Sequence, residues 1–297
     1  MVQKKLIWTD KEEELFSAIA GGHLLTTKNA ILAIESAIQA GANVNAKHSS
    51  STTPLIFVCF CPIVNLAVKI LLDNGADVNA KTRSLETALM FACDNPDIEP
   101  ETIQLLLDNG ADVNAKDYDG MTALMKVCRN RRVKPEKLNK IITLLLDKGA
   151  SANATDRSDN TPLMYACDNA HTKLETIQLL LNRGGAEVNA VNSVNRTPLA
   201  FALDNAKLDP QVIKLLVVNG AQLNEPQLAR VMKKLTKANA DKKQTKQKLS
   251  EAEQKIANLT KQVDKNKEQK VLNDFLAKKR EKRLLRAIRL GRVRGCK

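Results

Sequence analysis

The sequence predicts an all-α solenoid built from stacked helix pairs, and three recurring features carry this prediction. A glycine followed by alanine recurs at intervals of 34, 35, 39, 36 and 35 residues, at Gly41, Gly75, Gly110, Gly149, Gly185 and Gly220. A Thr-x-Leu step and an apolar stretch recur in phase with the glycine. Repetition with a period of roughly 20 to 50 residues is typical of chains in which each copy buries its apolar face against the next.

The Thr-x-Leu step predicts the start of the first helix in each copy. A threonine hydroxyl caps a helix N-terminus, and a proline in the first turn loses no hydrogen bond. The apolar residues that follow lie on one face of a short helix. The step occurs at Thr53-Pro54-Leu55, Thr87-Ala88-Leu89, Thr122-Ala123-Leu124, Thr161-Pro162-Leu163 and Thr197-Pro198-Leu199.

The apolar stretch before each glycine predicts the second helix of the pair. Residues 101–107 and 175–181 share the sequence Glu-Thr-Ile-Gln-Leu-Leu-Leu, which places its large apolar side chains on one helical face. The glycine then takes the left-handed conformation that ends a helix. A strand-like Asp-Val-Asn-Ala sequence, as at 112–115, leads into a turn rich in Asp, Asn and Gly. We therefore expect a β-hairpin loop after each helix pair.

Together these motifs resemble the ankyrin repeat, whose signature joins Thr-Pro-Leu-His-x-Ala-Ala to Leu-Leu-Leu-x-x-Gly-Ala-Asp-Val-Asn-Ala. The resemblance covers about residues 10–225 and implies an ankyrin-repeat solenoid of helix-turn-helix units with β-hairpin loops. The family histidine is replaced at Ile56, Met90, Met125, Met164 and Ala200. The interval from threonine to glycine is longer than in the family, and we expect the added residues to form exposed connectors at 94–100, 129–138, 168–174 and 204–210, with Pro96, Pro100, Pro135 and Pro210 in them.

Charge divides the chain near Pro226. Residues 1–225 contain 23 Lys/Arg and 26 Asp/Glu, a net of −3, whereas 226–297 contain 23 and 7, a net of +16, and the two sum to +13. We expect an N-terminal capping repeat at 1–47, whose helices lie at 10–20 and 28–39, and five full repeats at 48–225. A coiled-coil-like helix is expected at 226–270, and a basic amphipathic segment at 271–297. The apolar seam at 249–263 favours self-association, with a solvated helix or an intramolecular hairpin as alternatives.

The basic segment has four competing interpretations. It is suited to an anionic membrane surface or a helix-binding groove, to nuclear import, to nucleic-acid phosphates, or to delivery into a host cell. The residues that carry them are Lys278, Lys279, Arg280, Lys282, Arg283, Arg286 and Arg289. Since the first residues lack the pattern of a secretory signal, we expect a cytoplasmic protein, with nuclear and host-cell destinations left open.

The sequence predicts no enzyme, no cofactor and no metal site. It has no Gly-rich phosphate loop and no Ser/His/Asp or Cys/His constellation, and its cysteines lack Cys-x-x-Cys spacing. Four cysteines lie six residues after a repeat threonine, where the family has a buried alanine, so we expect them to be inert core residues: Cys59, Cys93, Cys128 and Cys167.

The resemblance implies a scaffold that binds a protein partner through its concave surface, as an adaptor, an inhibitor or a host-directed effector. The competing function is binding of nucleic acid or an anionic membrane through the basic C-terminal helix. Family members bind through hairpin tips and the exposed ends of first helices. The residues here that match those places are Arg83, Glu86, Asp94, Asn95, Tyr118, Asp119, Met121, Arg129, Arg157, Asn160, Asp168, Asn169, Arg196 and Asp204.

Overall fold

A computed structural model of the chain describes residues 9–20, 27–48, 50–60 and 64–224, together with residues 227, 230, 231 and 234. The chain divides into two compact units, Met1–Val212 and Ile213–Lys297. Apart from those four helical residues, the predicted coiled-coil-like helix at 226–270 lies outside the described residues. The self-association seam at 249–263 and the basic segment at 271–297, with Lys278, Lys279, Arg280, Lys282, Arg283, Arg286 and Arg289, lie wholly outside them.

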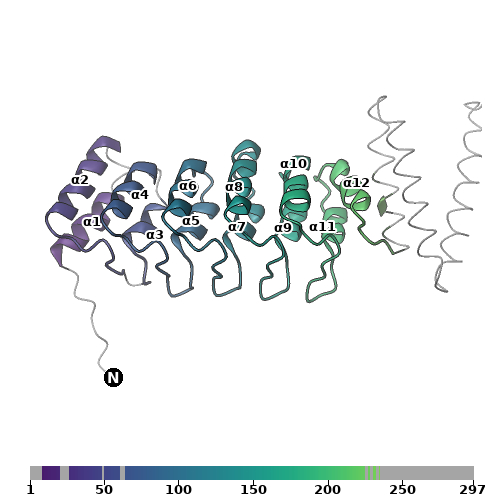
Figure 1. Cartoon of the computed structure of the whole chain (residues 1–297), viewed down its shortest axis with the longest axis horizontal. Coiled ribbons are helices and arrows are strands. Elements are labelled where there is room, and N and C mark those ends of the chain that lie inside the picture. The colour runs from purple at the N-terminus through teal and green to yellow at the C-terminus, as the bar shows by residue number, and fades with distance from the viewer. Residues whose placement is uncertain are drawn as a thin grey trace, which may run out of the picture. The chain divides into compact units, whose positions relative to one another are not determined.

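The helices of the first unit form two layers (Figure 1). One layer holds the first helix of each pair: α1 (Asp10–Ala20), α3 (Pro54–Val58), α5 (Ala88–Asp94), α7 (Ala123–Arg129), α9 (Pro162–Asp168) and α11 (Pro198–Asp204). The other holds α2 (Thr27–Gln39), α4 (Val64–Asp73), α6 (Pro100–Asp108), α8 (Pro135–Asp147) and α10 (Leu174–Gln178), which η2 (Leu179–Arg183) continues; α12 (Pro210–Val218) follows α11 in the chain. Each first helix contacts the next first helix, and each second helix contacts the next second helix.

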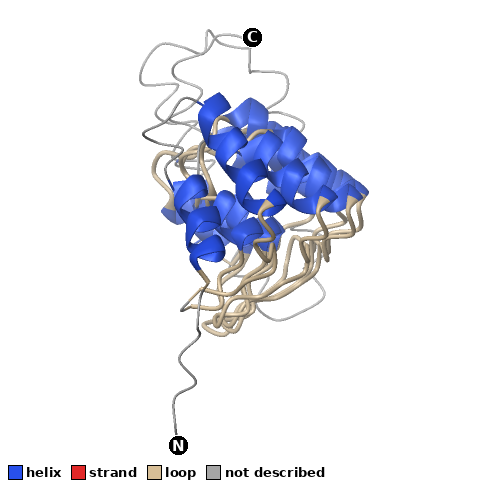
Figure 2. Ribbon diagram, turned by 90° about the vertical axis from the view of Figure 1, so that its left-hand side faces the viewer, coloured by secondary structure: helices blue, strands red, loops and turns tan. Residues whose placement is uncertain are grey.

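The loops between pairs project to one side of the helices (Figure 2). They turn as hairpins, because the two ends of each tip are joined by a backbone hydrogen bond, such as the 3.0 Å bond from the N–H of Asp117 to the carbonyl of Met121. The described residues contain no β-strand, however. The expected β-hairpins are therefore reduced to tight turns. The Val-Asn-Ala segment forms a turn instead of a strand, in which the N–H of Ala115 donates to the carbonyl of Asp112 at 3.3 Å.

The local signals for helix starts and ends are confirmed. The hydroxyl of each repeat threonine accepts from the backbone N–H three residues on, at 3.3 to 3.4 Å. The six repeat glycines all have positive φ, between 63° and 94°. The four predicted core cysteines are buried thiols, and burial raises the pKa of the Cys93, Cys128 and Cys167 thiols far above their ordinary value. They fill the core as small apolar side chains.

The expected connectors are shorter than predicted. Each runs for five residues, at 95–99, 130–134, 169–173 and 205–209. Three of the prolines assigned to connectors, Pro100, Pro135 and Pro210, are instead the first residues of second helices, where a missing N–H costs nothing. The added residues of the third repeat therefore lengthen α8 to 13 residues, against nine in α6, which is one extra helical turn.

Two rows of asparagine side chains join neighbouring repeats. The first row, which we call the loop asparagines, consists of Asn45, Asn79, Asn114 and Asn153. The side-chain amide of each donates to the carbonyl of the next repeat's glycine at 2.9 to 3.0 Å. Its oxygen accepts from the backbone N–H two residues beyond that glycine. In the second row, the helix-end asparagines, each amide donates back to carbonyls where the preceding first helix ends; the row is Asn95, Asn130, Asn169 and Asn205. Both rows set the register of one repeat against the next.

One repeat holds an extra residue in its second helix. The segment 175–186 corresponds to 101–111, with the same first seven residues and the same Gly-Ala end, but has one more residue between them. The helix α10 widens there into the π-helical turn η2 at Leu179. The N–H of Ala186 therefore bonds six residues back to Leu180 at 3.0 Å, whereas Ala111 bonds five residues back to Leu106. A single inserted residue in a helix is commonly absorbed as such a π-bulge.

The bulge requires glycine at position 184. A Cβ added to Gly184 would lie 2.7 Å from the carbonyl oxygen of Leu180 and 2.8 Å from the Cβ of Ala152. We expect Gly184→Ala to lower the free energy of unfolding by about 1–3 kcal/mol, because overpacking forces the backbone to shift. Denaturant unfolding measures this. Asn182→Ala, an exposed change in the same turn, is the control; equal stability of the two variants would contradict the account of the bulge.

Candidate functional site

One position on the first helices lies beside the hairpins in most repeats. It lies four residues after the repeat threonine and is aromatic in four copies, Phe57, Phe91, Tyr165 and Phe201, all half-buried. The third copy has Lys126 there, and its side chain is only 6% exposed. The row therefore forms an aromatic inner wall that a lysine interrupts in the middle.

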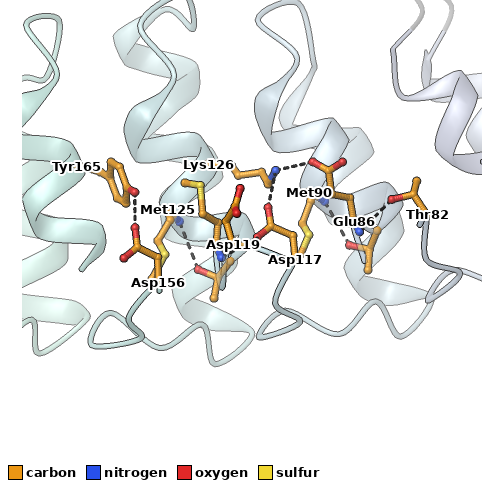
Figure 3. Close-up of polar contacts among 12 residues, drawn as sticks. Thr82, Glu86, Met90, Asp117, Asp119, Met125, Lys126, Asp156 and Tyr165 are labelled. Atoms are coloured by element: carbon orange, nitrogen blue, oxygen red, sulfur yellow. Dashed lines mark hydrogen bonds and ion pairs between the residues drawn. The ribbon is translucent and has the colours of Figure 1, made fainter. Parts of the chain in front are cut away.

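Lys126 is buried between two carboxylates from neighbouring hairpins (Figure 3). Its Nζ lies 2.7 Å from Oε1 of Glu86 and 2.9 Å from Oδ2 of Asp117. Burial by itself lowers the pKa of Lys126, but the hydrogen bonds and charges of Glu86 and Asp117 outweigh it, so the pKa is raised. The lysine is held charged and joins the hairpins of the second and third repeats.

A hydrogen-bonded network holds Tyr165 in place (Figure 3). Its hydroxyl donates to Oδ2 of Asp156, whose other oxygen accepts from the N–H groups of Ser158 and Asn160 at 2.8 Å each. The side-chain oxygen of Asn160 in turn accepts from the side-chain amide of Asn192 in the next hairpin at 2.8 Å. Partial burial raises the pKa of Asp156, but these hydrogen bonds outweigh it and hold the pKa below its ordinary value.

The last residues of the first helices form a row of charges beside the aromatic wall. Three copies end in an exposed aspartate, Asp94, Asp168 and Asp204, whereas the third ends in Arg129. Asp168 pairs with Arg131 at 2.9 Å, and both side chains are more than half exposed. Asp204 pairs with Arg196, whose guanidinium lies 4.1 Å from the centroid of the Phe201 ring. Such exposed pairs contribute little to stability, so these groups are available to a ligand.

Two adjacent hollows follow this wall. The first, of about 470 Å³, is lined by Asp94, Pro96, Arg129, Asn130, Arg131, Arg132, Tyr165 and Asp168. The second, of about 270 Å³, is lined by Ser158, Asn160, Met164, Tyr165, Asp168, Asn192, Ser193, Val194, Arg196 and Phe201. Because Tyr165 and Asp168 line both, the hollows join into one surface, which we call the inner groove. It has a basic end at the third repeat and an apolar end at the fifth.

The family profile described as "Ankyrin repeats (3 copies)" matches residues 15–117, 67–156, 99–192 and 133–227. These overlapping matches cover more than half of the chain. The chain belongs to the ankyrin-repeat family. No curated protein matches the sequence significantly. Among the helices described, none is both long and apolar enough to cross a bilayer.

The ankyrin hairpin tips are tied to one another along the array. The N–H of Tyr118 donates to the Ser84 carbonyl at 2.8 Å, and that of Arg157 donates to the Asp119 carbonyl at 2.9 Å. The Arg157 guanidinium lies 3.8 Å from the centroid of the Tyr118 ring, a distance at which a cation is attracted to an aromatic face. Tyr118 is 58% exposed. Arg83, Tyr118, Asp119 and Arg157 thus lie on an exposed tip row, as expected for surface residues.

The other residues predicted for the partner surface are divided by the structure. Asp94, Arg129, Asn160, Asp168 and Arg196 line the inner groove, and Asp204 borders it through its pair with Arg196. Glu86 is half-buried against Lys126.

Three predicted contact residues need correction. Met121 is 4% exposed and belongs to the core. Asn169 is 1% exposed, and its amide donates to the carbonyls of Cys128 and Asn130 at 3.0 Å each. Asn95 is half-buried and donates to the Cys59 carbonyl at 2.8 Å. These asparagines join repeats, so their side chains are not free to contact a partner.

Sequence reasoning missed Arg131, Arg132, Tyr165 and Phe201 as groove residues. It assigned 129–138 to an exposed connector and gave the two aromatic residues no role. The signal lay in comparing copies position by position: four residues after each repeat threonine the third copy alone departs from an aromatic, and seven residues after it the third copy alone has a basic residue. Both departures bring positive charge to the same repeat.

The network around Asp156 predicts an acid sensitivity. A carboxyl with a folded pKa below its ordinary 3.8 contributes stability above that value, and the contribution is lost as pH falls through the folded pKa. We expect Asp156→Asn to fold at neutral pH, because Asn192 makes the same turn contacts in the next hairpin. As the pH is lowered below about 4, the unfolding free energy of this variant should decrease less than that of the unmodified chain. Denaturant titration at each pH measures both. Parallel pH profiles would contradict this.

Proposed function

We propose that this array is a protein-interaction module that holds a peptide segment of its partner in the inner groove. Ankyrin repeats generally mediate protein–protein interaction, and the observation that carries the proposal is the continuity of the two hollows through Tyr165 and Asp168. A groove lined by residues of four successive repeats suits an extended segment. It combines aromatic, arginine and carboxylate side chains, a mixture typical of the energetic centres of interfaces.

The groove side chains are held before any partner binds. Tyr165 is fixed by Asp156, and Arg196 is fixed by Asp204 above the Phe201 ring. A partner that binds to side chains already ordered loses less conformational entropy than one that must order them. This preorganisation supports binding at the groove over binding at isolated charged side chains elsewhere on the surface.

The cellular role is part of the proposal. We place the interaction in the cytoplasm, where the array acts as an adaptor, an inhibitor or a host-directed effector. A second candidate function rests on the net +16 of residues 226–297, which supports binding to nucleic acid or an anionic membrane, or targeting to the nucleus or a host cell. Phosphate binding of that kind weakens steeply with salt, whereas recognition in the groove depends on salt much less.

Two valines of one hairpin provide a matched test. Val194 is 67% exposed and lines the apolar end of the groove, whereas Val191 is 56% exposed and lies outside it. Peptides selected from a displayed random library against the array should bind Val194→Asp at least about tenfold more weakly, because the carboxylate must be desolvated beside the bound apolar group. Val191→Asp should bind as the unmodified chain does.

Fluorescence anisotropy with the selected peptides measures both affinities, and thermal melts check that each variant folds. Exposed substitutions usually change stability by less than about 0.5 kcal/mol. Equal affinity of Val194→Asp and the unmodified chain for every selected peptide would place the binding site elsewhere and contradict the proposal.

A further inference from the structure

We infer that the inner groove selects a peptide segment with a carboxylate next to a bulky apolar side chain. The carboxylate binds at Arg129 and Arg132 of the third repeat, and the apolar side chain enters the hollow of Tyr165, Val194 and Phe201. This inference rests on the proposed function and specifies the chemistry of the partner.

The third repeat is where the array departs from its own pattern. Its first helix ends in Arg129, where the first helices of the second, fourth and fifth repeats end in Asp94, Asp168 and Asp204. Two more arginines, Arg131 and Arg132, follow at once in the connector. The helix pairing needs none of this positive charge, since three of the other repeats pack with an aspartate at the same place. The arginines therefore call for a role outside the fold.

Two of the three arginines have no acidic partner in the described part of the chain. Arg131 is paired with Asp168, whereas no carboxylate of the described residues lies within 4.0 Å of the guanidinium of Arg129 or Arg132. Both side chains are exposed and line the same hollow of about 470 Å³. A guanidinium binds a carboxylate through two parallel N–H groups, one of the stronger polar contacts that proteins make.

The adjoining hollow is shaped for an apolar group. Its wall is made by the rings of Tyr165 and Phe201 and by Val194, and buried Met164 lies at its base. Its polar groups are largely engaged with one another, because Arg196 pairs with Asp204 and the Asn160 and Asn192 amides join at 2.8 Å. With a volume of about 270 Å³, it is suited to one leucine or phenylalanine side chain of a partner.

The surroundings favour a short acidic peptide over a nucleic acid. The arginines are bordered by Asp94 on one side and by Asp168 and Asp204 on the other. A phosphate backbone carries one charge per nucleotide and would cross these carboxylates, where like charges repel. A peptide with one or two carboxylates can place them at the arginines alone. The net charge of −3 over residues 1–225 also opposes binding of a long polyanion to the array.

The test uses the full chain and the library-selected peptides. We expect Asp or Glu beside Phe, Tyr or Leu to be enriched among them. Synthetic versions with Asn or Gln in place of the acids should bind at least about tenfold more weakly, because a charge-assisted contact becomes a neutral one. Arg129→Glu with Arg132→Glu should cause a similar loss, and this variant should recover affinity for peptides that carry Lys in place of the acid.

Arg83→Glu is the matched control, since Arg83 is an exposed arginine on a hairpin tip outside both hollows; it should leave every affinity unchanged. Peptides that respond to Val194→Asp but show no preference for acids would overturn this inference and leave the proposed function standing. Peptides that ignore Val194→Asp would instead contradict the proposed function. Tighter, Arg129-dependent binding of a single-stranded DNA oligonucleotide would overturn the inference in favour of a nucleic-acid ligand.

Discussion

The amide of Asn169 donates to two carbonyls of the preceding repeat at 3.0 Å, and it represents a contact that recurs along the array. In a solenoid each repeat touches only its neighbours, so the position of every repeat depends on the interface before it. Apolar packing supplies most of the driving force but has no direction. The hydrogen bonds of the helix-end and loop asparagines are directional, and so they fix how far one first helix lies from the next. The width of the inner groove follows from that spacing.

The third repeat shows what this scaffold tolerates. It accepts a buried lysine in the aromatic row because carboxylates of two hairpins, Glu86 and Asp117, neutralise it. Removing one partner of such a buried group leaves an uncompensated charge, so the three residues are interdependent. The same repeat lengthens α8 by a turn and adds the arginines of the groove. The third repeat therefore carries several departures at once, while the asparagine contacts on either side keep it in register with its neighbours.

Much of the fold could be predicted from the sequence, because its signals are local. A threonine cap, a glycine with positive φ and an apolar helix face each depend on a few adjacent residues. The same was not true of Met121 and Asn169, which were expected on the surface. Asn169 is buried against the preceding repeat, about 40 residues away in the chain, and Met121 is buried although it lies in a hairpin. The π-bulge at η2 was missed for a related reason: the sequence shows one extra residue before Gly185, but only packing against Ala152 shows where it is accommodated.

The groove was predicted in part, for the same reason. Asp94, Arg129, Asp168 and Arg196 follow from their places in the repeat, whereas the joining of two hollows at Tyr165 is a property of several repeats together. The most direct test of the account is the unfolding free energy of Asn169→Ala beside that of Asn109→Ala, whose amide donates only within its own helix, to Leu105. We expect Asn169→Ala to lose about 1–3 kcal/mol, because it leaves buried carbonyls without a donor, and Asn109→Ala to lose less than about 0.5 kcal/mol. Equal losses in the two variants would show that the asparagines between repeats do not hold the array in register.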